Sequence, residues 1–393
     1  MSTYYVYDSQ TSTGITLLED DVLHVSSGGI ANGTVISDGG RQIVSGGGVT
    51  YGAKIYGGSY GVISSGREDV SSGGRTFGTT VYAYGNQTVS SGGVASGTVV
   101  SSGGYQNLYE GNAVATVLNG GTQDVHAGAA ASGTVISSGG WQWVYNKSVA
   151  SGTTIFDGGV QTVISSYTYT PQLPGSANGT VVSSGGSQVI SSGGIASGTT
   201  LSSGANLIVS EGGSAIGVIH ESGGLINVVV TSGDAATTMT GTNENGSFSI
   251  SGGIAKNLIL YDGCSVTVSS GATLDNATRY QNANVDIQSG ATVTNTLYKD
   301  WTLYYDQGLT LNSGDRSENT ILRDQLACEV VNYGATASGT FMTKYTSQCV
   351  YGVASGTTVS AYAGAYQYVK SGGVAVSTFI HTYTNGSVGG QVV

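Results

Sequence analysis

The phrase that decides the fold begins at Ala131. Residues 131–157 read ASGTVISSGGWQWVYNKSVASGTTIFD, and residues 196–213 read ASGTTLSSGANLIVSEGG. Both stretches contain a Gly-Thr pair, β-branched residues, a Ser-Gly turn and a short strand-like segment that leads into a second turn. One phrase is therefore repeated along the chain, and repetition of this kind determines the architecture before any single residue does.

The repeat has a nearly constant period. Gly179, Gly198 and Gly217 keep the spacing that separates Gly133 from Gly152. The glutamines of the strand-like segment recur at the same spacing, with one shorter step, at Gln87, Gln106, Gln123, Gln142 and Gln161. Residues 14–28 already align with residues 198–212. We therefore predict one continuous array over residues 1–393.

Each repeat predicts short strands separated by tight turns. Thr98–Ser101 (TVVS) and Gln106–Tyr109 (QNLY) are examples, with a turn at Ser102–Gly104 between them. Glycine suits such corners because it adopts positive φ angles. Strands this short form no stable sheet alone, whereas stacked coils pair their backbones above and below. The predicted fold class is an all-β, single-stranded parallel β-solenoid with about 19 residues per coil.

Two columns of side chains are expected along this solenoid. An aliphatic residue follows each glutamine by two positions, at Val89, Leu108, Val125, Val144 and Val163. Alternate side chains of a strand share one face, so the aliphatic residues are expected to fill the core. The glutamine amides are expected to bond from coil to coil. Whether the glutamines lie in the core or at a corner stays open.

Three segments depart from the repeat. Loop excursions are expected near residues 165–175 (SSYTYTPQLPG) and 231–252, and an irregular segment at 297–331. Loops that leave one side of a solenoid often carry binding sites.

Composition excludes several function classes. The 393 residues include 66 glycines, 2 prolines and only 9% charged residues, with 39% apolar residues and a net charge of −11. Glycine without a three-residue period excludes collagen, and the apolar content excludes a disordered acidic tail. The negative charge argues against nucleic acid or an anionic membrane as partner. No apolar stretch is long enough for membrane insertion.

No catalytic or metal motif emerges. The acidic clusters are Glu19–Asp21, Glu68–Asp69 and the carboxylates between Asp300 and Asp324. The first replaces the Ser-Ser-Gly turn of the aligned repeat and most simply solvates a corner, and we expect no enzyme and no cofactor. The histidines are too far apart for a metal site: His24, His126, His220 and His381. The chain has three cysteines, of which Cys328 and Cys349 could form a bridge between neighbouring coils.

The aromatic residues give one candidate ligand contact. The chain has 25 tyrosines against 5 phenylalanines and 3 tryptophans. Trp141 and Trp143 lie two positions apart on one strand and therefore share a face, and Tyr145 follows two positions later. Together the three rings could stack against a sugar ring. Aromatic side chains that merely cover the edges of a narrow rod are the alternative interpretation.

The repeated phrases resemble a known family. SSGGIASGTTLSSG (191–204), SSGGVASGTVVSSGGYQNLY (90–109) and AASGTVISSGGWQWVY (130–145) resemble the strand-loop-strand repeats of AIDA-type autotransporter passengers, the self-associating adhesins. The resemblance covers roughly residues 14–290 and 334–373. It implies a right-handed β-helix exposed on a bacterial cell surface or secreted, which serves adhesion, autoaggregation or biofilm formation.

The resemblance also implies partners and a modification. Partners would be other copies of the protein, host or matrix glycans, and a heptosyltransferase that modifies serines. The matching turn serines are Ser27, Ser72, Ser91, Ser102, Ser138, Ser184, Ser192 and Ser203. Two other functions stay open: a filament subunit that stacks end to end, and a carbohydrate-binding or carbohydrate-processing β-helix such as a phage tailspike. Serines that only shape the turns remain the simpler interpretation.

Overall fold

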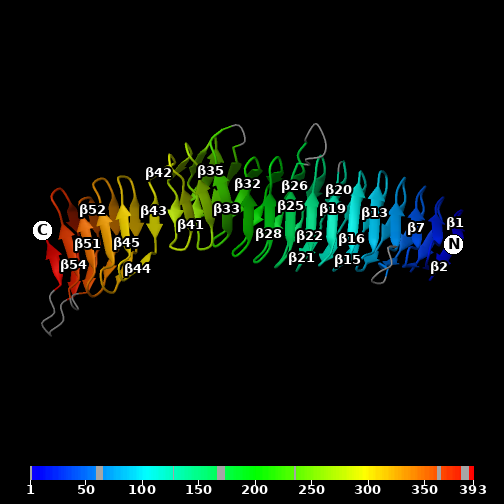
Figure 1. The fold of residues 1–393 in the computed structure, drawn as a ribbon, viewed down its shortest axis with the longest axis horizontal. Coiled ribbons are helices and arrows are strands. Elements are labelled where there is room, and N and C mark those ends of the chain that lie inside the picture. Colours follow the sequence, from blue (N-terminus) through cyan, green and yellow to red (C-terminus); the bar gives the residue numbers. More distant parts are fainter. Residues whose placement is uncertain are drawn as a thin grey trace. The chain divides into compact units, whose positions relative to one another are not determined.

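The fold is a stack of β-coils. The computed structural model describes residues 2–58, 65–126, 128–165, 173–233, 236–360, 364–381 and 389–393. Every regular element in these ranges is a β-strand, and most coils contribute three short strands that pair in parallel with the next coil (Figure 1). The predicted parallel β-solenoid is thus confirmed, while its right-handedness stays a prediction.

The contacts divide the chain into two compact units. The first holds residues 1–228 and 235–244, and the second holds residues 229–234 and 245–393. Each unit is described by itself, and a single continuous array over the whole chain stays a prediction.

One face of the first unit carries the glutamine strands. We name it the first face; its strands are β1 (Thr3–Val6), β4 (Val22–Val25), β7 (Arg41–Val44), β10 (Arg67–Val70), β13 (Asn86–Ser90), β16 (Tyr105–Tyr109), β19 (Thr122–Val125), β22 (Trp141–Val144), β25 (Val160–Val163), β28 (Ser187–Ile190) and β31 (Asn206–Val209). Gln142 of β22 lies between Gln123 and Gln161 in register, as the predicted period requires. Sequence neighbours one period apart are therefore neighbours in the stack.

The other two strands of a coil meet at a glycine corner. After β22 the chain forms β23 (Val149–Ser151) and β24 (Thr154–Ile155), separated by Gly152 at a φ of 63°. These strands pair with β20 (Ala130–Ser132) and β21 (Val135–Ser137) of the coil before. A left-handed backbone at this corner favours glycine, which explains why glycine recurs there.

The core of each coil is small and repeats. In the coil that starts at β22 the inward side chains are Gln142, Val144, Ala150, Thr153 and Ile155, and all are buried. The glutamine column therefore lies in the core, which the sequence alone left open. The aliphatic column lies beside it, as expected.

The first two expected excursions have different structures. The chain leaves the stack at Ser165 and returns at Gly175, where the amide donates to the Ile164 carbonyl at 3.3 Å; residues 166–172 lie outside the described residues. The segment 231–252 is not a loop alone, because it contains β34 (Thr238–Asn243) and β35 (Gly246–Ser251). Strand β34 pairs in parallel with β32 (Ser214–His220), and β35 pairs antiparallel with β36 (Ile254–Lys256).

The segment 297–331 keeps its strands although it loses the Ser-Gly phrase. Strand β43 (Leu297–Lys299) pairs in parallel with β46 (Arg316–Glu318), and β45 (Gly308–Leu311) with β48 (Cys328–Val331). The segment therefore keeps regular strands although its turn sequences depart from the repeat. Backbone pairing depends on coil length and on alternation of side chains, and both persist when the turn residues change.

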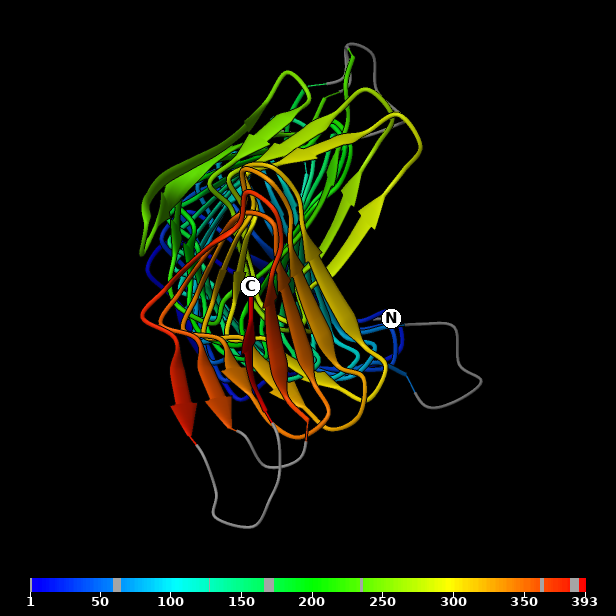
Figure 2. The same ribbon diagram turned by 90° about the vertical axis from the view of Figure 1, so that its left-hand side faces the viewer.

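The stack of the second unit nevertheless slips by one strand at this place. Strands β41 (Asn284–Ile287) and β42 (Thr292–Thr294) pair with the coil before them and with no later strand of the described residues. Strands β44 (Thr302–Tyr304) and β45 begin new sheets. The inward-column residue Ile287 is consequently 49% exposed, and in Figure 2 the yellow strands stand apart from the orange strands that follow.

Candidate functional site

The glutamine side chains on the inner face form a ladder of hydrogen bonds from coil to coil around β22. The Gln142 Nε2 group donates to Gln123 Oε1 at 2.6 Å, and Gln161 Nε2 donates to Gln142 Oε1 at 2.7 Å. Thr153 Oγ1 donates to the same Gln142 oxygen at 3.2 Å. Buried amides need such partners, and here the neighbouring coils supply them. This part of the ladder is a structural element with no group left for a ligand.

One rung of the ladder holds a carboxyl group. Glu68 occupies the glutamine column and is fully buried. Five side chains donate to its oxygens: Thr50, Thr76, Thr79, Gln42 and Gln87. Burial raises the pKa of Glu68, and these hydrogen bonds oppose the rise. The next residue, Asp69, points to the outer face, so the Glu68–Asp69 pair cannot act together on one substrate.

The outer side of the first face forms its own columns. The central outer column contains Ile43, Asp69, Thr88, Asn107, Asp124, Trp143 and Thr162. Two of these members are aspartates, and their surroundings differ.

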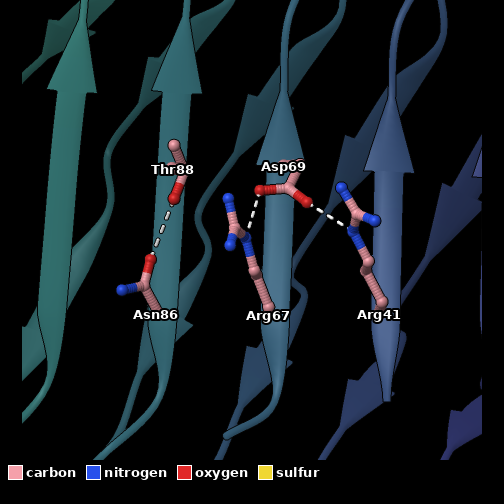
Figure 3. A network of polar contacts seen from close by, with 5 residues as sticks. All are labelled: Arg41, Arg67, Asp69, Asn86 and Thr88. Atoms are coloured by element: carbon pink, nitrogen blue, oxygen red, sulfur yellow. Dashed lines mark hydrogen bonds and ion pairs between the residues drawn. The ribbon is translucent and has the colours of Figure 1, made fainter. Parts of the chain in front are cut away.

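Asp69 is neutralised by two arginines. Its carboxylate oxygens lie 2.6 Å from Arg41 Nε and 2.5 Å from Arg67 Nε (Figure 3). On the following rung Thr88 donates to the Asn86 side chain at 3.0 Å. Each arginine lies two residues before the column position, on the same rung as Asp69 or on the rung before it. An outward aspartate in this column is thus satisfied by cationic groups at two defined positions.

Asp124 lacks both of these partners. The position of Arg67 is taken by Thr122, and that of Arg41 by Tyr105. The Asp124 Oδ1 atom is buried and has no hydrogen-bond partner among the described residues. Burial raises the pKa of this carboxyl group to about 6. The carboxyl group therefore ionises near neutral pH with its charge uncompensated.

Aromatic rings surround Asp124. We name as the aromatic patch the six outward residues Tyr105, Tyr109, His126, Trp141, Trp143 and Tyr145. Ring centroids lie 4.6 Å apart for Tyr109 and His126, and 4.9 Å for His126 and Tyr145. The rings of Trp141 and Trp143 are stacked at 5.2 Å. Trp141 and Tyr109 are 40% and 48% exposed, so the patch faces solvent.

Two residues of the aromatic patch, His126 and Tyr145, have pKa values shifted towards their neutral forms. Burial lowers the pKa of His126, which favours its neutral form at neutral pH. Burial, and then the charges of Asp124 and Tyr109, raise the pKa of Tyr145 to about 12, which keeps its hydroxyl protonated. Asp124 is therefore the acidic group that lies beside these aromatic side chains.

The structure brings the three predicted ligand-contact residues together. Trp141, Trp143 and Tyr145 lie side by side on the outer face with near-parallel rings; their role in binding stays a prediction. Sequence reasoning missed Asp124 and His126 as members of this site. A signal existed, because each lies one period before an aromatic member, at Trp143 and Tyr145.

The eight candidate serines lie in turns, and all are exposed. They form two columns, one after and one before the glutamine strands. The first column contains Ser27, Ser72, Ser91 and Ser192, and the second contains Ser102, Ser138, Ser184 and Ser203. Their hydroxyl groups are therefore open to a modifying enzyme, and modification itself stays a prediction.

The remaining candidates do not form sites. Cys264, Cys328 and Cys349 are free, and Cys328 lies opposite Ser347 rather than opposite Cys349. Among the described residues no three potential metal ligands cluster. The same residues include no helix with the length and apolarity that a membrane span needs.

Comparison with known proteins gives a family. The model of the adhesin of the bacterial autotransporter system, probable stalk (AIDA), matches residues 174–224 and 240–300. The chain carries AIDA-type stalk repeats. The resemblance seen in the sequence is thereby confirmed over these two segments, where the chain is similar to the stalk of an autotransporter adhesin. No curated protein sequence matches it.

Solved structures match the chain at low similarity. The TibC-catalyzed hyper-glycosylated TibA55-350 fragment is 24% identical, with 99% of this chain and 94% of that chain covered and a TM-score of 0.41. A GH87 alpha-1,3-glucanase from Streptomyces thermodiastaticus is 13% identical, with 93% and 64% covered and a TM-score of 0.24. A tailspike protein of E. coli bacteriophage HK620 is 10% identical, with 99% and 70% covered and a TM-score of 0.20. None of the three supports a functional argument.

Proposed function

We propose that the chain is a non-enzymatic surface or secreted repeat protein that mediates adhesion, autoaggregation or biofilm formation through the outer faces of its coils. The AIDA-type stalk repeats support this function. The observation that carries this proposal is the difference between the inner and the outer side chains of a coil. Around β22 the inner glutamine and threonine groups are buried and bond to one another, so the outer columns are what a partner can reach.

Repetition explains how weak outer contacts hold two cells together. Each coil presents its outward side chains at the same positions, although the residues at these positions vary from coil to coil. Contacts between two such surfaces then add along the stack, and a second contact forms at a high effective concentration once the first is made. Other copies of the chain are the partner that this arrangement fits best.

Surface display tests the proposal directly. Bacteria that display the chain should settle from suspension, and cells that display an unrelated β-solenoid should not. Settling should weaken when purified chain is added as a competitor. Negative-stain microscopy of the pure protein tests the filament alternative. Isolated rods favour the adhesin, whereas long fibres indicate end-to-end stacking into a filament. Loss of viscosity of a polysaccharide would instead indicate a carbohydrate-processing protein and contradict the proposal.

We also propose O-linked heptose on the turn serines, added by a heptosyltransferase. Exposure of all eight hydroxyl groups in tight turns supports this modification. Intact-mass measurement of the chain from cells with and without such an enzyme should differ by whole heptose units. Replacement of Ser91 and Ser102 by alanine should lower the number of units, while replacement of the buried Ser148 should leave it unchanged.

A further inference from the structure

We propose that the aromatic patch around Asp124 binds an amino sugar, with the sugar ring against the aromatic side chains and its ammonium group on the Asp124 carboxylate. This inference goes beyond the proposed function, because it adds a glycan partner to self-association. It assigns a role to Asp124 and to the aromatic patch that the stalk architecture does not require.

The first argument for a cationic ligand is that Asp124 lacks the partners that Asp69 has. In the same outer column Asp69 receives two guanidinium groups at 2.5 and 2.6 Å. At Asp124 those two positions hold Tyr105 and Thr122, neither of which supplies a cation. Asp124 is partly buried and its Oδ1 atom has no hydrogen-bond partner among the described residues, so a cation from outside the chain would lower the cost of its charge. The ligand thus supplies the charge that the chain omits.

The second argument, which favours a sugar, comes from the aromatic rings. Trp141 and Tyr109 offer exposed aromatic surface, and Trp143 lies opposite Asp124 in register. Aromatic faces attract cations placed over them and also pack against the C–H surface of a sugar ring. A ligand that joins a flat apolar face to an ammonium group uses both features at once.

The charge of the chain decides between ligand classes. With a net charge of −11 the chain repels anionic glycans, so uronic and sialic acids are poor candidates. A neutral hexose would use the rings but leave the Asp124 charge uncompensated. Glucosamine has both a pyranose ring and an amino group that is cationic near neutral pH. A short glucosamine oligomer is therefore the probe that fits the site.

The experiment uses the tryptophans as reporters. Two of the chain's 3 tryptophans lie in the patch, and a Trp301→Phe background removes the signal of the third. Titration of this protein with a glucosamine oligomer should change its fluorescence. Asp124→Asn should weaken binding about tenfold, the scale of one charge-assisted contact. Trp141→Ala should weaken it as well, with circular dichroism confirming that both variants keep their fold.

Two variants serve as matched controls. Asp69→Asn makes the same substitution in the same column at an ion-paired position, and Tyr51→Ala removes an aromatic ring that is 46% exposed on another face. Both should bind like the parent protein. If Asp69→Asn weakens binding as much as Asp124→Asn, the ligand recognises the general charge of the surface and the proposed site is wrong.

Three further probes decide the ligand class. An N-acetylglucosamine oligomer and a cellulose oligomer carry the ring without the charge, and a lysine oligopeptide carries the charge without the ring. All three should bind more weakly than the glucosamine oligomer. Equal binding by the neutral sugars contradicts the role of Asp124, and equal binding by the peptide contradicts the sugar.

The settling test separates this inference from the proposed function. If cells that display Asp124→Asn still settle while sugar binding is lost, both statements hold. If the glucosamine oligomer fails to bind while parent cells settle, only the amino-sugar site is wrong. If it binds and parent cells do not settle, the self-association role is the one contradicted.

Discussion

The two faces of strand β22 differ in whether their residues repeat in the neighbouring coils. Inside, Gln142 and Val144 repeat what the strands above and below present, and the Gln142 amide finds its partners in the same column. Outside, Trp141 and Trp143 differ from the residues above and below them, and Asp124 Oδ1 has no hydrogen-bond partner in the described part of the chain. Repetition therefore maintains the fold, while departure from repetition on the outer face marks the place where something else can bind.

The largest effect on the free energy of unfolding is expected from a charge introduced on the inner face. Val144→Asp places a carboxylate where the valine side chain is fully buried. We expect a loss of about 4 kcal/mol or more and unfolding of several coils, because burial of an unpaired charge belongs to the most destabilising changes. Thermal melting followed by circular dichroism measures it.

The matched control is the same substitution on an outward valine. Val149 of β23 is 36% exposed, and Val149→Asp should change stability by no more than about 0.5 kcal/mol. If both variants melt at the same temperature, the inward assignment of the column that contains Val144 is wrong.

A break in the glutamine ladder should have the next largest effect. Gln142→Leu keeps the volume but removes the acceptor of Gln161 and Thr153 and the donor to Gln123. Buried groups that lose their partners cost about 1–3 kcal/mol in total for a site of this kind. Denaturant melting measures the loss, and hydrogen exchange should show it in the two neighbouring coils.

An exposed amide provides the comparison for this variant. Asn112 of β17 (Asn112–Val114) points outward, so Asn112→Leu should leave stability nearly unchanged. An equal loss in both variants would mean that the amide ladder contributes no more than a surface residue does.

Periodicity made the inner face predictable. The glutamine column and the aliphatic column recur at nearly constant spacing, so the period alone placed Gln142 between Gln123 and Gln161. The outer site was only partly predictable. Trp141, Trp143 and Tyr145 stand together in the sequence, whereas Asp124 joins them through a pairing that spans one whole period and is notable only for the partners it lacks.

The slip near β43 could not be predicted for a related reason. All strands of a coil are short and alternate in the same way, so the sequence of residues 297–331 fits more than one place in the stack. The choice is made by side chains at the break. Trp301 donates to the Arg279 carbonyl at 3.0 Å, and the Gln281 amide bonds to both backbone groups of Thr302. The last contact covers the open edge of β44 with a side chain in place of a strand.

A pH series sharpens the comparison on the outer face. The folded-state pKa of Asp124 is about 6, above its value of about 4 in an unfolded chain, so the folded protein holds the proton more tightly. This group contributes stability that is fully present below pH of about 4 and is lost as the pH rises through about 6.

The parent protein should therefore lose stability as the pH rises from acid to neutral, and Asp124→Asn should not show this loss. Above pH of about 6 the variant should be more stable than the parent by up to about 2 kcal/mol, after allowance for partial exposure of the group. At pH of about 4 the two proteins should melt together. A variant that is less stable than its parent at neutral pH would show that the carboxylate has a partner in the folded chain.

The smallest effect is expected at Asp69, and it should have the opposite sign. Asp69→Asn removes two contacts to arginines whose side chains are 49% exposed, so the loss should be about 0.5–1 kcal/mol at neutral pH. High salt should reduce the difference from the parent, because exposed ion pairs are screened. Melting at low and high salt measures both. The same substitution at two rungs of one column would then destabilise the protein where the chain provides the cation and stabilise it where the cation is left to a ligand. Equal signs at both rungs would show that the column does not distinguish them.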